Sequence, residues 1–245
     1  MNTLCICAKN EIYKIFHREK YRIMLAVTLG VTVCGALIGL ISNSVISFSS
    51  QNYPYAVLSL CCYLVIPFTA LMLASDLISV EFERNEWKLL LTRHFSRTKL
   101  LLGKLAAIVI YELVLTAANV IAALIFSLIL SGFTSVNIFA VLMSVVITII
   151  PTAAFVSFAG FLSVLCKSGI SAFGLGVAAY GGVTLLGLVF SKISGILFTS
   201  YLAVYKMIIG QDIPIFRFVL SVFILLGFLL VFISGASIRF EKREF

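Results

Sequence analysis

The sequence predicts an all-α membrane protein with six transmembrane helices. Hydrophobic residues make up 62% of the 245 residues and charged residues only 11%, whereas soluble domains carry about 25% charged residues. The apolar residues gather in six runs, and a helix needs about 20 such residues to cross a bilayer. We therefore expect residues 1–245 to form a single transmembrane domain in a lipid membrane, with no soluble domain attached.

The six expected spans follow one another with short connections. They are residues 23–41, 55–75, 105–130, 138–165, 170–190 and 218–234. Pro67 is expected to bend the second span, because proline removes one helical hydrogen bond.

Residues 3–20 predict an amphipathic helix that lies in the membrane interface. At about 100° per residue, one arc is apolar and the opposite arc is polar. The apolar arc holds Leu4, Cys5, Ala8, Ile12, Ile15 and Phe16, and the polar arc holds Asn10, Lys14, His17 and Arg18. Such a helix lies on a bilayer and does not cross it.

Residues 191–217 contain an apolar run, 196–209, that is too short to cross the membrane. Irregular backbone at membrane depth is tolerated only where protein or a wet cavity surrounds it. We therefore expect short extracellular re-entrant helices in this insertion.

The longest charged segment lies between the second and third spans, at residues 79–100. It begins with carboxylates such as Glu81 and ends with cations, including Arg97 and then Lys104. This order suits a helix dipole. Apolar residues, among them Trp87, recur at helical spacing, so the segment is either a helix that rests in a partner's groove or a solvated loop.

The basic residues predict the orientation. With both termini in the cytoplasm, 15 of the 18 Lys and Arg residues face inward, and only Lys192, Lys206 and Arg217 face outward. This asymmetry follows the positive-inside rule and predicts a multi-pass protein of the plasma membrane. It also accounts for the net charge of +8 without nucleic acid as a partner.

Few residues of the sequence could carry catalysis. The two histidines, His17 and His94, have no metal-ligand spacing, and the six cysteines include no C-x-x-C pair. No phosphate-binding loop or nucleophile motif is present. We expect no catalytic residue, no metal site and no cofactor in this chain.

Two polar residues of the third span are candidates for a translocation path. Glu112 lies about eight residues beyond Lys104, and Asn119 shares its helical face at i+7. A carboxylate at this depth is costly unless it faces protein or a wet cavity. Glu112 therefore lines a path for a cationic or amphipathic substrate, or makes a structural ion pair or hydrogen bond; the sequence leaves both open.

Small residues one helical turn apart predict close helix packing. Gly35 and Gly39 lie in the first span, and Gly174 and Ala178 lie in the fifth. Such spacing lets two backbones approach closely. The two pairs form either a dimer interface or contacts within one chain.

This arrangement resembles the membrane subunits of type-2 ABC exporters over the whole chain. The most specific part runs from Glu81 through Leu89–Leu91 to Phe95-Ser96-Arg97 and then Lys104. In that family a glutamate, a leucine-containing helix, a Phe/Pro-Ser-Arg turn and a lysine recur in this order. Where the family often has Gly-Thr after the glutamate, this chain reads Asn85-Glu86-Trp87.

The resemblance implies a permease that works with a separate cytoplasmic ATP-binding-cassette ATPase, which binds the ATP and Mg²⁺. A second copy, or a sibling permease, would complete the membrane part. The charged segment would be a coupling helix, anchored by burial of apolar side chains in the ATPase and oriented by the charges beside them. The implied coupling residues are Glu81, Trp87, Leu90, Leu91, Arg97 and Lys104.

The cargo that fits best is an amphipathic or antimicrobial peptide, because small Gram-positive export and immunity permeases for lantibiotics look similar. Other cargo, namely a drug, an ion or a lipid-linked polymer, remains an alternative. So do a membrane sensor or scaffold that transports nothing, and a stand-alone secondary transporter.

Overall fold

The computed structural model describes residues 3–41, 52–84, 87, 97–131, 137–190, 194–209 and 215–242. All regular structure in these ranges is helical. Six helices within these ranges are long and apolar enough to cross a membrane, so the all-helical class and the multi-pass character agree with the prediction.

The elements follow the predicted order. They are α1 (Thr3–His17), α2 (Glu19–Ile41), α3 (Tyr53–Leu60), the π-helix η2 (Cys61–Val65), α4 (Ile66–Ala74), the π-helix η3 (Ser75–Ser79), α5 (Val80–Glu83), α7 (Arg97–Ser131), α8 (Ile138–Ile147), α9 (Ile149–Leu165), α10 (Gly169–Val189), the 3₁₀-helix η4 (Phe198–Tyr201), α12 (Lys206–Ile209) and α13 (Ile215–Glu241).

Two spans extend further into the charged segment than predicted. The second span continues without a break from Tyr53 to Glu83, and α7 begins at Arg97, eight residues before the expected start at 105. Charge alone does not end a helix, and Lys104 finds carboxylate partners inside the protein. The two helices therefore carry the ends of the charged segment into the folded body.

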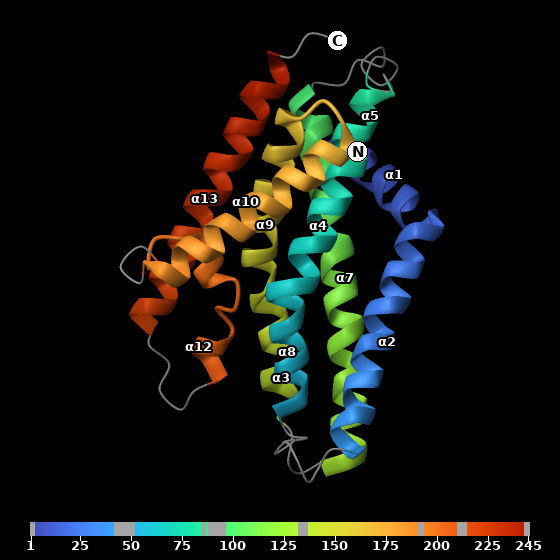
Figure 1. Cartoon of the computed structure of the whole chain (residues 1–245), viewed down its shortest axis with the longest axis vertical. Coiled ribbons are helices and arrows are strands. Elements are labelled where there is room, and N and C mark those ends of the chain that lie inside the picture. Colours follow the sequence, from blue (N-terminus) through green and yellow to red (C-terminus); the bar gives the residue numbers. More distant parts are fainter. Residues whose placement is uncertain are drawn as a thin grey trace.

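The ends of the charged segment lie at the same end of the bundle as α1. Figure 1 shows α1, α5, the start of α7 and the last turns of α13 grouped there, while α3 and α8 begin at the opposite end. The short connection between α9 and α10 also lies at the α1 end. We call this end the termini end.

The core lies along α7 and α9, which pack against each other and against most other helices. Gly160 of α9 is needed for this contact, since a Cβ there would lie 2.4 Å from Cδ2 of Leu105. By contrast, α2, α10 and α13 carry many exposed apolar side chains, such as Ile170, Leu188 and Phe216. Their outer faces suit a lipid environment.

A π-helical turn, η2, precedes Pro67 in the second span. Pro67 has no N–H to bond the carbonyl of Tyr63 one turn earlier. The hydroxyl of Tyr180 in α10 donates to that carbonyl at 2.7 Å. The predicted irregularity at Pro67 is therefore a π-turn, and a second helix provides the missing hydrogen-bond donor.

The insertion before the last span contains η4 and α12. Phe198 of η4 is buried and packs against Phe155 and Phe158 of α9 and Phe228 of α13. Phe228 lies at the middle of α13, about 20 Å from either helix end at 1.5 Å per residue. The insertion therefore reaches the central level of the bundle.

Candidate functional site

A cluster of four charges, three of them buried, lies at the termini end of the bundle. Glu81 of α5 and Lys104 of α7 have 2% and 0% of their surface exposed. Nζ of Lys104 donates to Oε2 of Glu81 at 2.6 Å. Glu81 lies near the start of the charged segment and Lys104 just beyond its end. These two residues, both predicted as coupling residues, are thus bonded to each other.

The helix α1 provides the other two charges. Nζ of Lys104 also lies 3.2 Å from Oε1 of Glu11. Lys14 lies 3.2 Å from the same oxygen of Glu11 and 3.6 Å from Oε1 of Glu81. Two ammonium groups and two carboxylates therefore connect α1, α5 and α7, with formal charges that cancel. We call Glu11, Lys14, Glu81 and Lys104 the charge cluster.

The charge cluster is not fully hydrogen-bonded. Oε2 of Glu11 and Oε1 of Glu81 are buried and accept no hydrogen bond from the described residues, since 3.6 Å from Lys14 is an ion-pair distance only. Burial of Lys14 lowers the pKa of its ammonium, but the carboxylates of Glu11 and Glu81 outweigh this effect and the net shift is upward. Lys14 therefore stays charged beside them.

The sequence arc of α1 did not identify Glu11. The buried stripe of the helix is Cys7, Glu11 and Ile15, at i, i+4 and i+8. The sequence feature that could have identified Glu11 is a carboxylate between two apolar positions of the same helical stripe. Its ion-pair partner, Lys104, lies 93 positions away, so the sequence did not indicate that the two residues meet.

Trp87 closes the apolar side of the charge cluster. Its ring stacks on Phe82 at 5.0 Å, meets Phe240 of α13 at 4.7 Å, and lies 5.0 Å from the ammonium of Lys104. Its Nε1 donates to the carbonyl of Ile78 at 3.2 Å. Trp87 thus connects the charged segment to α13.

This position bears on one expectation. Trp87 has no exposed surface, and its ring packs within the chain; its role as an anchor in an ATPase stays a prediction. Glu81 and Lys104 are likewise buried and act as internal partners. Leu90 and Leu91 lie outside the described residues, and of Arg97 only the backbone, at the start of α7, is described.

Glu112 is fully buried near the middle of the bundle. Oγ1 of Thr69 in α4 lies 2.8 Å from Oε2 of Glu112, while Oε1 accepts no hydrogen bond from the described residues. No salt bridge engages Glu112 within those residues. Of the two structural contacts expected for Glu112, the described residues show a hydrogen bond and no ion pair; its place on a substrate path stays a prediction.

Asn119 binds α2 to α7. Its Oδ1 accepts from Oγ1 of Thr32 at 2.7 Å, and its Nδ2 donates to Oγ1 of Thr28 at 3.2 Å. Tyr53 of α3 donates to the backbone carbonyl of Thr32. Asn119 is therefore a structural bridge between helices as well as a wall of the cavity described next.

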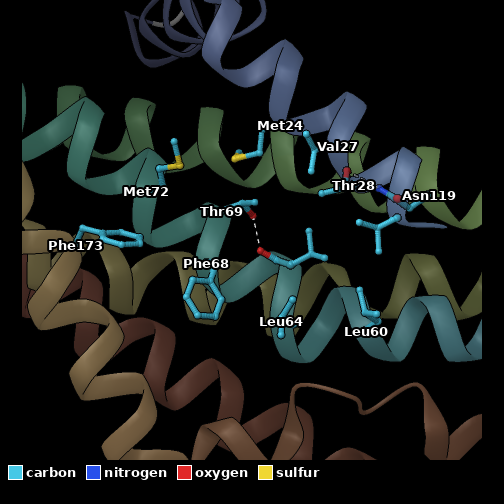
Figure 2. A pocket seen from close by; sticks show the side chains of 12 residues that line it. Met24, Val27, Thr28, Leu60, Leu64, Phe68, Thr69, Met72, Asn119 and Phe173 are labelled. Carbon is cyan, nitrogen blue, oxygen red and sulfur yellow. Dashed lines mark hydrogen bonds between the residues drawn. The ribbon is translucent and has the colours of Figure 1, made fainter. Parts of the chain in front are cut away.

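An apolar cavity of about 360 Å³ lies between α2, the second span and α7. Figure 2 shows Met24, Val27 and Thr28 on one side facing Leu64 and Phe68 on the other. Thr69, Met72, Asn119 and Phe173 also line it. Val27, Leu64 and Phe68 are more than two-fifths exposed, so the cavity opens toward the apolar outer face of the helices. We call it the α2–α4 groove.

A second, more polar cavity of about 310 Å³ adjoins this groove and shares Met72 and Phe173 with it. Lys20 and Asp76 line its mouth. Nζ of Lys20 lies 2.6 Å from Oδ2 of Asp76, and the hydroxyl of Tyr21 donates to the same oxygen at 2.9 Å. Asp76 of the second span thus has an ion-pair partner, Lys20, in the first span.

The predicted dimer interface divides into a covered half and an open half. A Cβ on Gly35 would lie 3.1 Å from the hydroxyl of Tyr53 in the same chain, and Gly39 is buried. Gly174 and Ala178 are exposed, and a Cβ on Gly174 would meet nothing within 4 Å. Gly35 therefore packs within the chain, and only Gly174 and Ala178 remain open to a partner.

Within the described residues, no group of three or more His, Cys, Asp and Glu side chains lies close enough to hold a metal ion.

A family model with the description "Protein of unknown function (DUF2705)" matches residues 15–245. No curated protein matches the chain.

Proposed function

The chain belongs to the DUF2705 family, and we propose that it is the membrane subunit of an ATP-driven ABC exporter. In this proposal it carries no catalytic site. A separate cytoplasmic ATPase binds ATP and Mg²⁺, and a second copy or a sibling permease completes the membrane part. Both termini face the cytoplasm across the plasma membrane, and the cargo is an amphipathic or antimicrobial peptide that leaves the cell or the bilayer.

The observation that carries the proposal is the charge cluster at the two ends of the charged segment. Burying ions is expensive, and a buried ion pair seldom adds stability over apolar packing. A connection between two spans does not require one. A connection that transmits force needs its two ends fixed to each other, and the ion pair of Glu81 and Lys104 fixes them here.

The contacts of the cluster suggest where such force would go. Glu11 and Lys14 connect the segment to α1, Lys104 connects it to α7, and Trp87 connects it to α13. Movement of the segment would thus tilt three helices together. In this scheme the ATPase contacts the apolar residues between Trp87 and Arg97, of which Leu90 and Leu91 are the sequence-predicted anchors.

The cargo path is proposed along the α2–α4 groove and Glu112. An amphipathic molecule in the bilayer reaches the groove sideways, because its rim residues are exposed. Asn119 lines the groove, and Thr69 both lines it and contacts Glu112. On the opposite side of the bundle, the insertion around Phe198 is proposed as an extracellular re-entrant element, supported by its depth beside Phe228.

The first test is whether a gene beside this one encodes an ATP-binding-cassette protein, and the second is reconstitution of the chain with that protein. Vesicles that contain both proteins should move a labelled lantibiotic across or out of the membrane when ATP is supplied on the side that carries the ATPase. Replacing Leu90 and Leu91 with alanine should abolish co-purification of the ATPase and ATP-driven movement, while insertion of the permease is unchanged.

Three results would overturn the proposal. Co-purification that survives the double leucine replacement rejects this docking segment. Movement driven by a proton gradient without ATP indicates a secondary carrier. Stable association with a cytoplasmic protein, without movement of any tested cargo, indicates a sensor or scaffold.

A further inference from the structure

The α2–α4 groove and the polar cavity beside it form one elongated site with two chemical ends. Along α2, the site runs from Lys20 at the polar mouth through Met24 and Val27 to Val31. From residue 20 to residue 31 the helix rises about 16 Å, of which the apolar part from Met24 to Val31 accounts for about 10 Å. The hydrocarbon region of one leaflet is about 15 Å deep, so the whole site has the depth of one leaflet and its apolar part has room for the greater part of an acyl chain.

The walls of the groove match an acyl chain in chemistry. They are mostly aliphatic and aromatic, and two methionines, Met24 and Met72, face each other at the polar end (Figure 2). Methionine side chains adapt their shape to irregular apolar ligands. The three polar side chains of the groove, Thr28, Thr69 and Asn119, already bond to protein atoms, so they impose no further polar requirement on the occupant.

The mouth carries one charge of each sign. Both hydrogen bonds to Asp76 use Oδ2, and within the described residues none uses Oδ1. The ammonium of Lys20 has three donor hydrogens, and its side chain is 49% exposed. Asp76 can therefore accept a hydrogen bond from an ammonium while Lys20 donates one to a phosphate, which is the arrangement of a zwitterionic headgroup.

We propose that this site binds a zwitterionic phospholipid of the termini-end leaflet, with one acyl chain in the α2–α4 groove and the headgroup at Lys20 and Asp76. The exposed apolar rim admits the chain from the bilayer, and the paired charges select the headgroup. The proposal goes beyond the transport function and holds whether or not an ATPase binds this chain; the lipid fills the groove while the groove holds no cargo.

Binding to the purified full-length chain in a nonionic detergent tests the site. The probes are lysophosphatidylethanolamine, lysophosphatidylglycerol and monoacylglycerol, all with the same acyl chain, and affinities are measured by native mass spectrometry. We expect lysophosphatidylethanolamine to bind about tenfold more tightly than either other probe, a difference of about 1.4 kcal/mol.

Two variants separate the chain from the headgroup. Val31→Trp fills the groove from its exposed rim and should lower the affinity for each of the three probes about tenfold. Lys20→Met should reduce lysophosphatidylethanolamine to the affinity of monoacylglycerol and leave monoacylglycerol unchanged. The matched controls are Val219→Trp on the exposed face of α13 and Lys99→Met on the exposed face of α7; neither should change any affinity.

Several outcomes would overturn the proposal. Equal binding of the three probes by the unmodified chain removes the role of Lys20 and Asp76. Unchanged binding by Val31→Trp places the acyl chain elsewhere. Strongest binding of lysophosphatidylglycerol indicates an anion site. If a cationic amphipathic peptide binds the groove and none of the three lipids does, the groove is assigned to a peptide. If Val31→Trp abolishes self-association of the chain, the groove is assigned to a second copy.

Discussion

The ammonium of Lys104 donates a 2.6 Å hydrogen bond to Oε2 of Glu81, and neither side chain is accessible to solvent by more than 2%. The bond joins α5, at the start of the charged segment, to α7, which begins near its end. Every movement of the segment relative to the membrane spans must therefore move this pair or break it.

The first prediction concerns the stability of the charge cluster. Lys104→Met should lower the free energy of unfolding by about 3–5 kcal/mol, because it leaves two buried carboxylates with Lys14 alone. Adding Glu11→Gln to this variant restores the balance of charge and should recover part of the loss. Denaturant-induced unfolding in micelles measures both. Lys99→Met, on the exposed face of the same helix, is the control; equal stability of the two lysine variants would contradict the prediction.

The second prediction uses the single tryptophan of the chain as a reporter. Because Trp87 packs between Phe82 and Phe240, its fluorescence should resist quenching by acrylamide in the isolated protein. Phe240→Ala should make the ring accessible, whereas Phe216→Ala, at an exposed position, should not. Strong quenching in the unmodified chain that disappears when the ATPase binds would show that Trp87 is a docking anchor after all.

The third prediction concerns the carbonyl of Tyr63. Tyr180→Phe removes its donor and should lower the free energy of unfolding by about 0.5–1.5 kcal/mol, the net contribution of a typical intramolecular hydrogen bond. Pro67→Ala supplies a backbone N–H one turn from Tyr63, so it should reduce the effect of Tyr180→Phe. A double-mutant cycle in thermal unfolding measures this coupling. Purely additive effects would mean that Pro67 and Tyr180 do not share the carbonyl.

The fourth prediction separates the two roles of Glu112. Glu112→Gln keeps an oxygen for the hydroxyl of Thr69 and should leave folding and ATPase binding intact while transport falls at least about tenfold. Thr116→Val, on the same helical face but bonded only to its own helix, is the control for transport. Loss of folded protein in Glu112→Gln would establish a structural role instead.

The fifth prediction concerns self-association. Gly174→Leu places a large side chain where nothing lies within 4 Å in the same chain, so the stability of the monomer should not fall. If Gly174 and Ala178 contact a second copy, the dissociation constant of the dimer in micelles should rise at least about tenfold. Gly30→Leu, also in open space but on α2, is the control. Unchanged association would exclude this face.

The sequence identified several site residues without their relationships. Glu81 and Lys104 were both candidates, yet their direct bond depends on how α5 docks beside α7. Amphipathic spacing marked Trp87 as a residue that seeks burial, but the same spacing fits a partner's groove and the protein's own α13. Likewise, the spacing of Gly35 could not distinguish a contact with Tyr53 in the same chain from a contact with another copy.

By itself, the sequence determined that the chain is helical and membrane-crossing, because runs of about 20 apolar residues have the length of a spanning helix and a helix satisfies its own backbone N–H and C=O groups in hydrocarbon. Length and hydropathy of each run suffice for that conclusion. Only the tertiary structure decided which buried polar groups meet: Glu11 with Lys104, Asn119 with Thr32, and Tyr180 with Tyr63. These contacts depend on the relative rotation and height of packed helices, and residues far apart in the chain carry no local signal of either.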